Sequence, residues 1–323
     1  MADSKVTLLP AGEISVPALE DLTYWVDDPS GTPVSNKASM TRAFGLLGLN
    51  PGGRLTLTTA VPITTSDVSA AGTVYYTPYL HDRIRIYDGT RWRVYSFTER
   101  SLALTATSGK NYDVFIYDNA GTLTLELSAA WTNNTTRSAA LTTQDGVTVK
   151  SGATTRLWLG TIRGAAANQT EDSVTKRFVW NAYNQVQRRL FKANATDNWA
   201  YNSVTVRQAN GDATQQVELV HGLLGTPLTL TVYAMGASSG ANYFSVSIGE
   251  DSTTAYSSDA INYQGGGVAS VLTPLAASMS KYPTLGYHYY AWLEAGNGSG
   301  VSTTFYSTNS GVRQGGLSGF IPG

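Results

Sequence analysis

The side chains best suited to acid–base or metal chemistry are few in this chain. Its three histidines, His81, His221 and His288, are widely separated in the sequence, and it has no cysteine. A His-Glu-x-x-His metal motif is absent. Disulfide and thiolate chemistry are therefore excluded, and a zinc site would have to come from the histidines alone.

Two adjacent acidic pairs are the other candidates for catalysis. In an extended chain the members of Glu171-Asp172 and of Glu250-Asp251 point to opposite faces, so neither pair forms a glycosidase dyad by itself. Carboxylates that are distant in sequence can still converge in space. This set of histidines and acidic residues, without cysteine, favours a protein that is not an enzyme and that needs no cofactor.

The sequence offers better candidates for ligand binding than for catalysis. The densest set of them lies between Arg83 and Tyr95. Two arms that alternate arginine with apolar residues flank Asp88-Gly89, a strong hairpin signal. A loop of odd length, with a positive φ at Gly89, gathers the apolar side chains on one face, namely Ile84, Ile86, Trp92 and Val94. The predicted contact face then holds Arg83, Arg85, Arg91 and Arg93, with Tyr87 and Tyr95. It suits anionic groups of a polysaccharide or an acidic partner protein, and arginines solvated beside local carboxylates explain it equally well.

Aromatic residues supply a second set of candidates. The chain has 19 tyrosines and seven tryptophans. Tyr287, Tyr289 and Trp292 are candidate glycan-stacking residues on a strand predicted at 287–293. Packing in a core or between subunits explains aromatic side chains on both faces of that strand at least as well.

Composition limits the class of protein. Of the 323 residues 14% are charged, well below the ~25% of typical domains. The net charge of −1 argues against nucleic-acid binding. Neither a secretory signal nor an apolar run of ~20 residues is apparent, so we expect synthesis in a cytoplasm and no membrane insertion.

The elements that must position these residues are predicted to be strands. Residues 1–52 read as a small attachment module with a strand at 22–26 and a short helix at 42–47. Residues 53–195 predict a β-sandwich or open β-barrel, and residues 196–323 a second antiparallel β-sandwich that is jelly-roll-like in element count.

Several local features refine this all-β prediction. A hairpin is expected where 112–117 and 122–127 flank the turn 118–121. Residues 178–188 are compatible with a short helix or an extended connector, and residues 315–321 with a last strand.

Parts of the chain resemble structural proteins of tailed-bacteriophage particles. The leading segment, residues 21–37, is similar to a short N-terminal module of virion proteins, especially fibres. Further resemblance lies in residues 75–79, 86–89, 112–118, 145–152, 176–181 and 286–290, which together span most of the chain. The resemblance implies a β-rich, usually trimeric assembly that is anchored on the particle at its N-terminus and carries no catalytic residues. Tail fibre, head fibre and capsid decoration protein all remain open.

The sequence therefore predicts a virion structural protein for surface display or host adhesion. Residues 1–52 are expected to contact other virion proteins (capsid, portal or neck, tail or baseplate), and the candidate attachment residues are Tyr24, Trp25, Asp27, Asp28 and Pro29. Its expected partners are its own copies, as a homotrimer, and a host surface polysaccharide. The alternatives are a receptor-binding tail fibre with a specific glycan site and a polysaccharide depolymerase.

Overall fold

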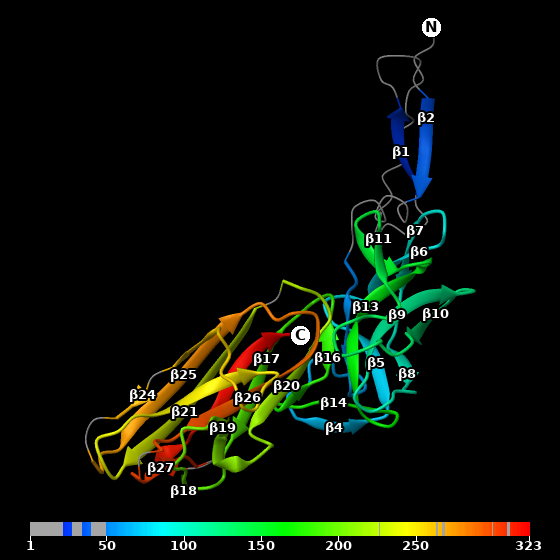
Figure 1. Cartoon of the computed structure of the whole chain (residues 1–323). Coiled ribbons are helices and arrows are strands. Elements are labelled where there is room, and N and C mark those ends of the chain that lie inside the picture. The colour runs from blue at the N-terminus through cyan, green and yellow to red at the C-terminus, as the bar shows by residue number, and fades with distance from the viewer. Residues whose placement is uncertain are drawn as a thin grey trace.

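Strands dominate the structure. The computed structural model describes residues 22–27, 34–39 and 50–323, except positions 226, 263, 267, 268, 299, 309 and 310. In this part of the chain the regular elements are strands, apart from two short 3₁₀ turns, η1 (Ala209–Gly211) and η2 (Gly311–Arg313). The all-β fold class is confirmed (Figure 1).

The strands fall into a leading hairpin, a proximal domain (β3–β16) and a jelly-roll domain (β17–β28). The hairpin and the proximal domain contain β1 (Leu22–Asp27), β2 (Val34–Ser39), β3 (Gly53–Thr56), β4 (Val68–Ala71), β5 (Thr73–Pro78), β6 (Arg83–Tyr87), β7 (Trp92–Ser96), β8 (Arg100–Ala103), β9 (Asn111–Asn119), β10 (Thr122–Leu127), β11 (Leu141–Gln144), β12 (Val147–Lys150), β13 (Ala153–Ala166), β14 (Gln169–Asp172), β15 (Lys176–Arg177) and β16 (Val179–Asn181). The jelly-roll domain contains β17 (Gln187–Ala193), β18 (Asn198–Ala200), β19 (Arg207–Gln208), β20 (Gln216–His221), β21 (Leu228–Ser238), β22 (Phe244–Glu250), β23 (Ala260–Asn262), β24 (Gln264–Gly265), β25 (Thr273–Lys281), β26 (Gly286–Ala295), β27 (Thr303–Tyr306) and β28 (Gly316–Pro322).

The leading hairpin confirms one sequence prediction. β1 and β2 pair antiparallel, so the strand predicted at 22–26 is present, whereas the predicted helix at 42–47 lies outside the described residues. Pro51 and Gly52 bond to the proximal domain: the carbonyl of Pro51 accepts from the side-chain amide of Asn184 (2.7 Å), and the N–H of Gly52 donates to the carbonyl of Arg83 (2.9 Å). Figure 1 draws the hairpin beyond the end of the proximal domain that carries β6 and β7.

The proximal domain has two sheets around one core. β3, β5 and β8 form a three-stranded sheet, and β10, β9 and β13 lie in the larger sheet that faces it. Leu55 and Tyr76 of the first sheet share a buried cluster with Val114 and Ile116 of the second, and Ile84 of the β6–β7 hairpin joins it. The alternation of apolar and polar residues therefore produces the predicted sandwich.

The predicted hairpin around residues 118–121 is confirmed. β9 and β10 pair with Asn119 opposite Thr122, which leaves Ala120 and Gly121 as the turn. Both turn residues have positive φ, 50° and 92°. This is the two-residue turn whose twist matches that of the flanking strands.

The second domain has jelly-roll strand order. One sheet runs β17-β28-β21-β25, and the facing sheet runs β20-β26-β22-β24. Of the seven connections between these eight strands taken in chain order, only that from β22 to β24 joins two strands of the same sheet, and the other six cross between the sheets, as in two linked Greek keys. Leu230 and Val232 of β21 pack in one buried cluster with Val246 of β22 and with Tyr290 and Trp292 of β26. The jelly-roll-like prediction is confirmed.

The segment 178–188 is extended. It contains β16 and the start of β17, so the extended alternative holds and the helix does not. β17 pairs along its length with β28, and its Leu190 is buried in the jelly-roll core. This strand therefore belongs to the second domain, although the predicted boundaries of 53–195 and 196–323 assign it to the first.

The two domains share a continuous sheet. β13 pairs with β14, β14 with β15, and the short β15 pairs in parallel with β20 of the jelly roll, Lys176 opposite Glu218. Backbone hydrogen bonds thus run from one domain into the other without a flexible linker between them.

A buried carboxylate reinforces this junction. Asp113 of β9 has no exposed surface. Its carboxylate accepts hydrogen bonds from four side chains: Trp131 (3.0 Å), Trp158 (3.0 Å), Thr161 (2.7 Å) and Arg137 (2.8 and 3.1 Å). A charge-assisted bond to each carboxylate oxygen compensates for the loss of hydration.

Arg137 connects this carboxylate to the jelly roll. Its guanidinium lies over the rings of Trp131 (4.4 Å) and Trp158 (5.2 Å), and it donates to the carbonyl of Gly222 just after β20 (2.5 Å). Only a residue without a side chain fits at Gly222, because a Cβ there would lie 2.4 Å from the Trp180 ring.

We expect Asp113→Asn to destabilise the protein by about 3–5 kcal/mol, because it leaves Arg137 partly buried without its counter-charge. Thermal unfolding followed by circular dichroism should show a midpoint lowered by roughly 10 °C. The double variant Asp113→Asn/Arg137→Met is the matched control. It should recover part of the loss, because no unpaired ion remains and the carboxamide oxygen still accepts from the buried donors around it. An Asp113→Asn midpoint equal to that of the parent would contradict the assignment.

Candidate functional site

The arginine hairpin has a four-residue turn in place of the predicted turn of odd length. Its paired positions are Ile84 with Tyr95, Arg85 with Val94, Ile86 with Arg93 and Tyr87 with Trp92. Asp88 accepts the N–H groups of Thr90 and Arg91 through Oδ1 (both 2.8 Å), which holds one more residue in the turn. Gly89 has the predicted positive φ (101°).

The predicted face of four arginines is therefore wrong. One additional turn residue moves every side chain of one arm to the other face of the ribbon. The buried Ile86 shares its face with Arg93 and Tyr95, whereas Arg83 and Arg85 lie on the opposite face.

The exposed arginines meet carboxylates of the hairpin itself. Arg83 lies 3.3 Å from Asp82, and Arg91 lies 3.8 Å from Asp88. A hydrogen bond from Arg93, followed by the backbone donors of the turn, lowers the pKa of Asp88 to about 2. Carboxylates of the hairpin thus compensate much of its positive charge, as the alternative of solvated arginines beside local carboxylates predicts.

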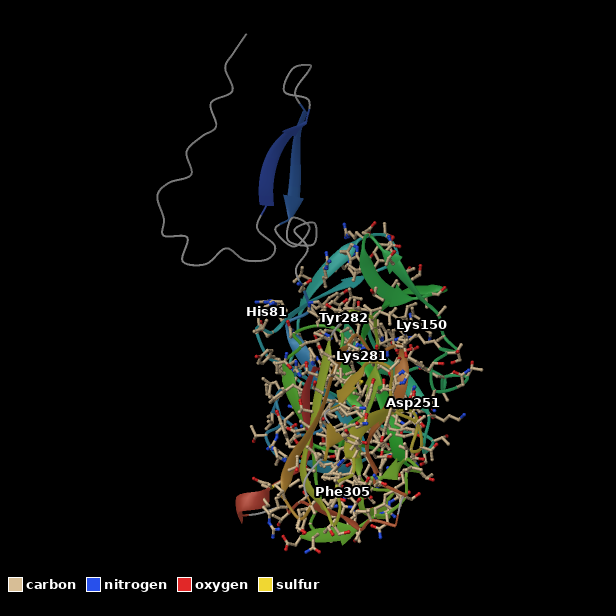
Figure 2. The ribbon with its side chains drawn as sticks, turned by 60° about the vertical axis from the view of Figure 1, so that its left-hand side comes forward. His81, Lys150, Asp251, Lys281, Tyr282 and Phe305 are labelled. Carbon is tan, nitrogen blue, oxygen red and sulfur yellow. The ribbon has the colours of Figure 1, made fainter. Side chains whose placement is uncertain are left out.

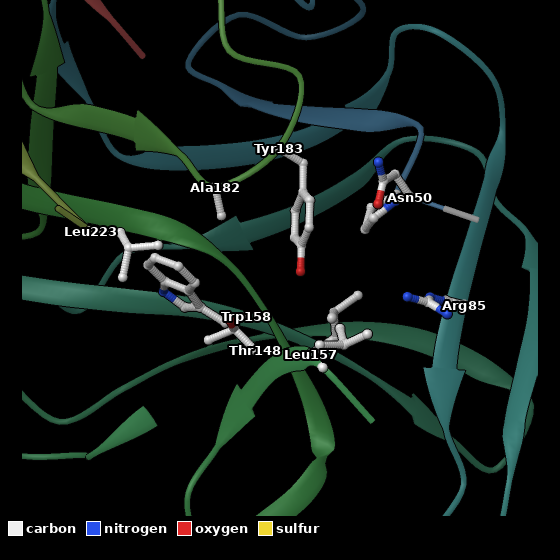
Figure 3. A pocket seen from close by; sticks show the side chains of 11 residues that line it. Asn50, Arg85, Thr148, Leu157, Trp158, Ala182, Tyr183 and Leu223 are labelled. Atoms are coloured by element: carbon white, nitrogen blue, oxygen red, sulfur yellow. The ribbon is translucent and has the colours of Figure 1, made fainter. Parts of the chain in front are cut away.

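Arg85 is the arginine of this hairpin that lines a pocket. The pocket has a volume of about 230 Å³, and its lining residues are Asn50, Pro51, Arg85, Gly146, Val147, Thr148, Leu157, Trp158, Ala182, Tyr183 and Leu223 (Figure 3). In Figure 3 the hydroxyl of Tyr183 points into the pocket, and Arg85 and Asn50 lie on the side facing it. β6, β12, β13 and the segment after β16 thus contribute to one site.

This pocket presents hydrogen-bond donors to a ligand. Burial raises the pKa of Tyr183 to about 12, so its phenol keeps its proton at neutral pH. Burial also lowers the pKa of Arg85, but a guanidinium stays charged in proteins. Among the described residues that line the pocket none is acidic, so the site suits a small anionic or hydroxyl-bearing group and offers no carboxylate base.

The two tyrosines of the predicted contact face are engaged within the proximal domain. The hydroxyl of Tyr95 donates to Asp118 (3.0 Å), and the ring of Tyr87 packs on Trp92 at 5.6 Å between centroids. The first contact joins the hairpin to β9, and the second packs the two arms of the hairpin together.

The predicted glycan-stacking set is wrong for Trp292, which is fully buried in the jelly-roll core. Tyr287 is half-buried, and its hydroxyl donates to Glu218 (2.8 Å) while the guanidinium of Arg163 covers its ring at 3.5 Å. Tyr289 is half-buried on the same strand. β26 therefore presents no shared aromatic platform formed by these three residues.

The candidate attachment residues lie at the leading hairpin. Tyr24, Trp25 and Asp27 belong to β1, and Asp28 and Pro29 lie outside the described residues. Their role in attachment stays a prediction.

A hydroxyl–imidazole–carboxylate series is present that the sequence interpretation missed. Asp251 Oδ2 lies 2.6 Å from His288 Nδ1, and His288 Nε2 lies 2.9 Å from the hydroxyl of Thr284. Hydrolase triads have the same order. Asp251 also accepts the backbone N–H of Tyr289 (3.0 Å), so the series fixes the turn after β22 to β26. The signal in the sequence was the Glu250-Asp251 pair, which gives no indication of a distant histidine.

A segment with the spacing of a hydrolase serine motif is a strand end in this fold. Residues 236–240 have Gly-x-Ser-x-Gly spacing, which in hydrolases places an exposed serine between a strand and a helix. Here Ser238 is buried at the end of β21, and β22 is the next regular element. The segment is thus the end of a strand.

Two of the histidines are neighbours in the fold although they are distant in sequence. His221 ends β20 and His288 lies on the adjacent β26. In the part of the chain that the structure describes, no three His, Asp or Glu side chains are grouped so as to hold a metal ion. In the same residues no helix has the length and apolar character needed to cross a membrane.

Comparisons with known proteins identify no family for this chain. No protein-family model matches the sequence. No curated protein matches it either. Among solved structures, the insecticidal crystal protein Cry7Ca1 of Bacillus thuringiensis is similar over 84% of this chain at 10% identity, with a TM-score of 0.18. The chain covers 51% of that protein, and so low a TM-score carries no argument about fold or function.

We expect stability to fall between pH 6.5 and pH 4 because of His221. Burial, and secondarily the charge of His288, lowers the pKa of His221 to about 4, whereas an unfolded histidine titrates near pH ~6.5. Above that range both states are neutral. Within it the unfolded state alone binds the proton, which removes about 3 kcal/mol by pH 4.

Melting midpoints at pH 7.5 and 4.5 should therefore differ more for the parent than for His221→Gln. The difference between the two proteins isolates this residue from the titrating carboxylates. An NMR titration that places the native His221 imidazole at its ordinary pKa would refute the interpretation.

Proposed function

We propose that this chain is a structural protein of a tailed-phage particle. Residues 1–52 attach it to another virion protein, and the two β-domains project as a homotrimer for display or adhesion. The similarity of the segments named above to virion proteins supports the particle assignment, and a rigid pair of β-domains suits a projecting arm. It is made in the host cytoplasm, ends in the virion, and performs no reaction.

The self-assembly part of this proposal depends on one observation. This is the composition of the outer face of the β17-β28-β21-β25-β23 sheet. Three rows of paired residues face outward: Arg189, Phe320, Thr229 and Ser280; Phe191, Ser318, Thr231, Ser278 and Ile261; Ala193, Gly316, Tyr233 and Ala276. We call these rows the outer sheet face. Arg189 is the one charged residue in the three rows, and its guanidinium lies over the ring of Phe191 at 4.2 Å.

Large apolar side chains are exposed on this face. Tyr233 is 59% exposed, Phe320 51% and Ile261 67%. A hollow of about 170 Å³ beside Tyr233 and Phe191 can receive a protruding side chain. Sheets that face water carry polar and charged side chains, and contiguous apolar patches mark interfaces.

A second copy of the chain is the partner that this face fits best. Covering it buries no carboxylate or lysine, so Arg189 is the one charge of the three rows that association would desolvate. At about 25 cal/mol per Å² the exposed aromatic and aliphatic area contributes a large favourable term. Identical copies packed in a closed ring leave no such face open to further association.

We expect the purified chain to have the mass of three copies at micromolar concentration in light scattering after size exclusion. Tyr233→Lys/Phe320→Lys should shift it to single copies, because two charges would have to be buried in each contact. Leu80→Lys is the matched control, since Leu80 is 65% exposed on the proximal domain. A parent protein that is monomeric under these conditions refutes the trimer.

The attachment assignment predicts that a chain lacking residues 1–49 folds but is lost from particles. The truncation keeps Gly52 and Gly53, which bond to the proximal domain. Immunoblots of purified particles should detect the full chain and not the truncated one, while circular dichroism of the truncated protein retains the β-sheet signal. Full incorporation of the truncated chain would disprove anchoring through this segment.

A further inference from the structure

A groove lies at the end of the jelly roll that carries β18, β24 and β27. Its volume is about 310 Å³, and the residues that line it include Tyr243, Phe244, Ser245, Tyr256, Gln264 and Asn297. We call it the distal groove. It is formed where the start of β22, the strand β24 and the end of β26 meet the segment that follows β18.

The distal groove lies far from the leading hairpin. Figure 1 places β18, β24 and β27 at the opposite end of the molecule from β1 and β2. Phe305, which packs edge-on against the groove residue Phe244 (6.2 Å between centroids), is labelled near that end in Figure 2. A protein held by its N-terminal segment presents this end outward.

The floor of the distal groove is part of the buried core, and its rim is aromatic. Phe244 is buried in the jelly-roll core, whereas Tyr243 is 69% exposed. The hydroxyl of Tyr256 lies 3.0 Å from that of Ser245, which holds the second tyrosine against the groove. An exposed ring beside an ordered one is a surface on which a flat apolar face can stack.

The polar groups of the lining are neutral. Gln264 and Asn297 bring amides, each with donors and an acceptor, and Ser245 and Tyr256 bring hydroxyls. Tyrosine with small amides and hydroxyls is the composition that adaptable protein paratopes use to bind polar ligands.

The lack of charged side chains among the lining residues disfavours ionic ligands. None of the residues named as lining the groove is charged. Glu294, adjacent to the lining residue Ala295, is fully buried and already accepts hydrogen bonds from Trp199 (2.6 Å) and Arg207 (2.9 Å). An anionic ligand would therefore lose hydration here without gaining a counter-charge.

We propose that the distal groove binds a neutral saccharide, with one or two sugar units stacked on Tyr243 and hydrogen-bonded by Gln264 and Asn297. A sugar ring has an apolar C–H face and a rim of hydroxyls, which match an aromatic ring flanked by amides. The volume lies at the lower end of the ~300–1,000 Å³ range of ligand pockets, which limits the occupant to this size. The inference rests on the proposed function, because only an anchored protein meets a host surface with this end.

The test uses the purified full-length chain on an array of neutral and acidic oligosaccharides, followed by titration calorimetry with the neutral oligosaccharide that binds best. Tyr243→Ala should weaken that binding at least tenfold, and Tyr243→Phe should stay within about threefold of the parent because the ring is kept. Tyr282→Ala is the matched control: Tyr282 is 65% exposed in the same domain but does not line the groove, and its removal should leave binding unchanged. Since Tyr243 is largely exposed, its replacement leaves the core intact.

Three results would overturn the inference: no neutral oligosaccharide binds, acidic ones bind in preference, or Tyr243→Ala binds as the parent does. Immunoblots of particles that carry Tyr243→Ala separate this failure from that of the proposed function. A chain that is incorporated but binds no neutral saccharide refutes the groove alone. A chain that binds the saccharide through Tyr243 but is absent from particles refutes the proposed function and leaves the groove intact.

Discussion

The buried contact between Asp113 and Arg137 fixes how the two β-domains stand relative to each other. β9 uses its two faces differently, because Val114 fills the proximal core on one side while Asp113 receives its donors on the other. Arg137 is held by this carboxylate and two indole rings, and then bonds the carbonyl of Gly222 in the jelly roll. Such a pair tolerates little change, because a partly buried ion without its partner costs several kcal/mol. The continuous sheet through β14, β15 and β20 joins the same two domains, so the backbone pairing and this contact act on one junction.

Most of the strand architecture could be predicted because it depends on local signals. The alternation in residues 112–117 and 122–127 and the glycine at 121 are enough to define the β9–β10 hairpin. The same reasoning failed at Asp88, where a side chain bonded to two backbone N–H groups lengthens the turn by one residue. That single residue reassigns a whole arm of the hairpin to the other face. A register that depends on such a bond cannot be derived from periodicity alone.

The candidate sites were less predictable, since they are assembled from distant segments. Trp292 and Tyr243 are both aromatic residues of jelly-roll strand regions. Trp292 lies inside β26, which has β20 and β22 on either side and a second sheet packed over it, and so the residue is buried. Tyr243 directly precedes β22 and is exposed at the edge of the distal groove. The sequence marks both as aromatic, and only the strand order separates them.

The low charge of the chain is unevenly distributed, and this unevenness links the proposed surfaces. Several of its ions are committed to buried or partly buried pairs near the junction, such as Asp172 with Arg177 and Arg188. Others serve the interior of the jelly roll, as Glu294 does with Arg207. The outer sheet face and the distal groove are left almost without charge. A surface depleted of ions is costly to expose and inexpensive to cover with apolar or hydroxyl-rich material, because neither side must shed a tightly held hydration shell. A chain whose charges are paired at the domain junction, in the β6–β7 hairpin and within the jelly roll is therefore suited to contact its own copies with one face and an uncharged ligand with its far end.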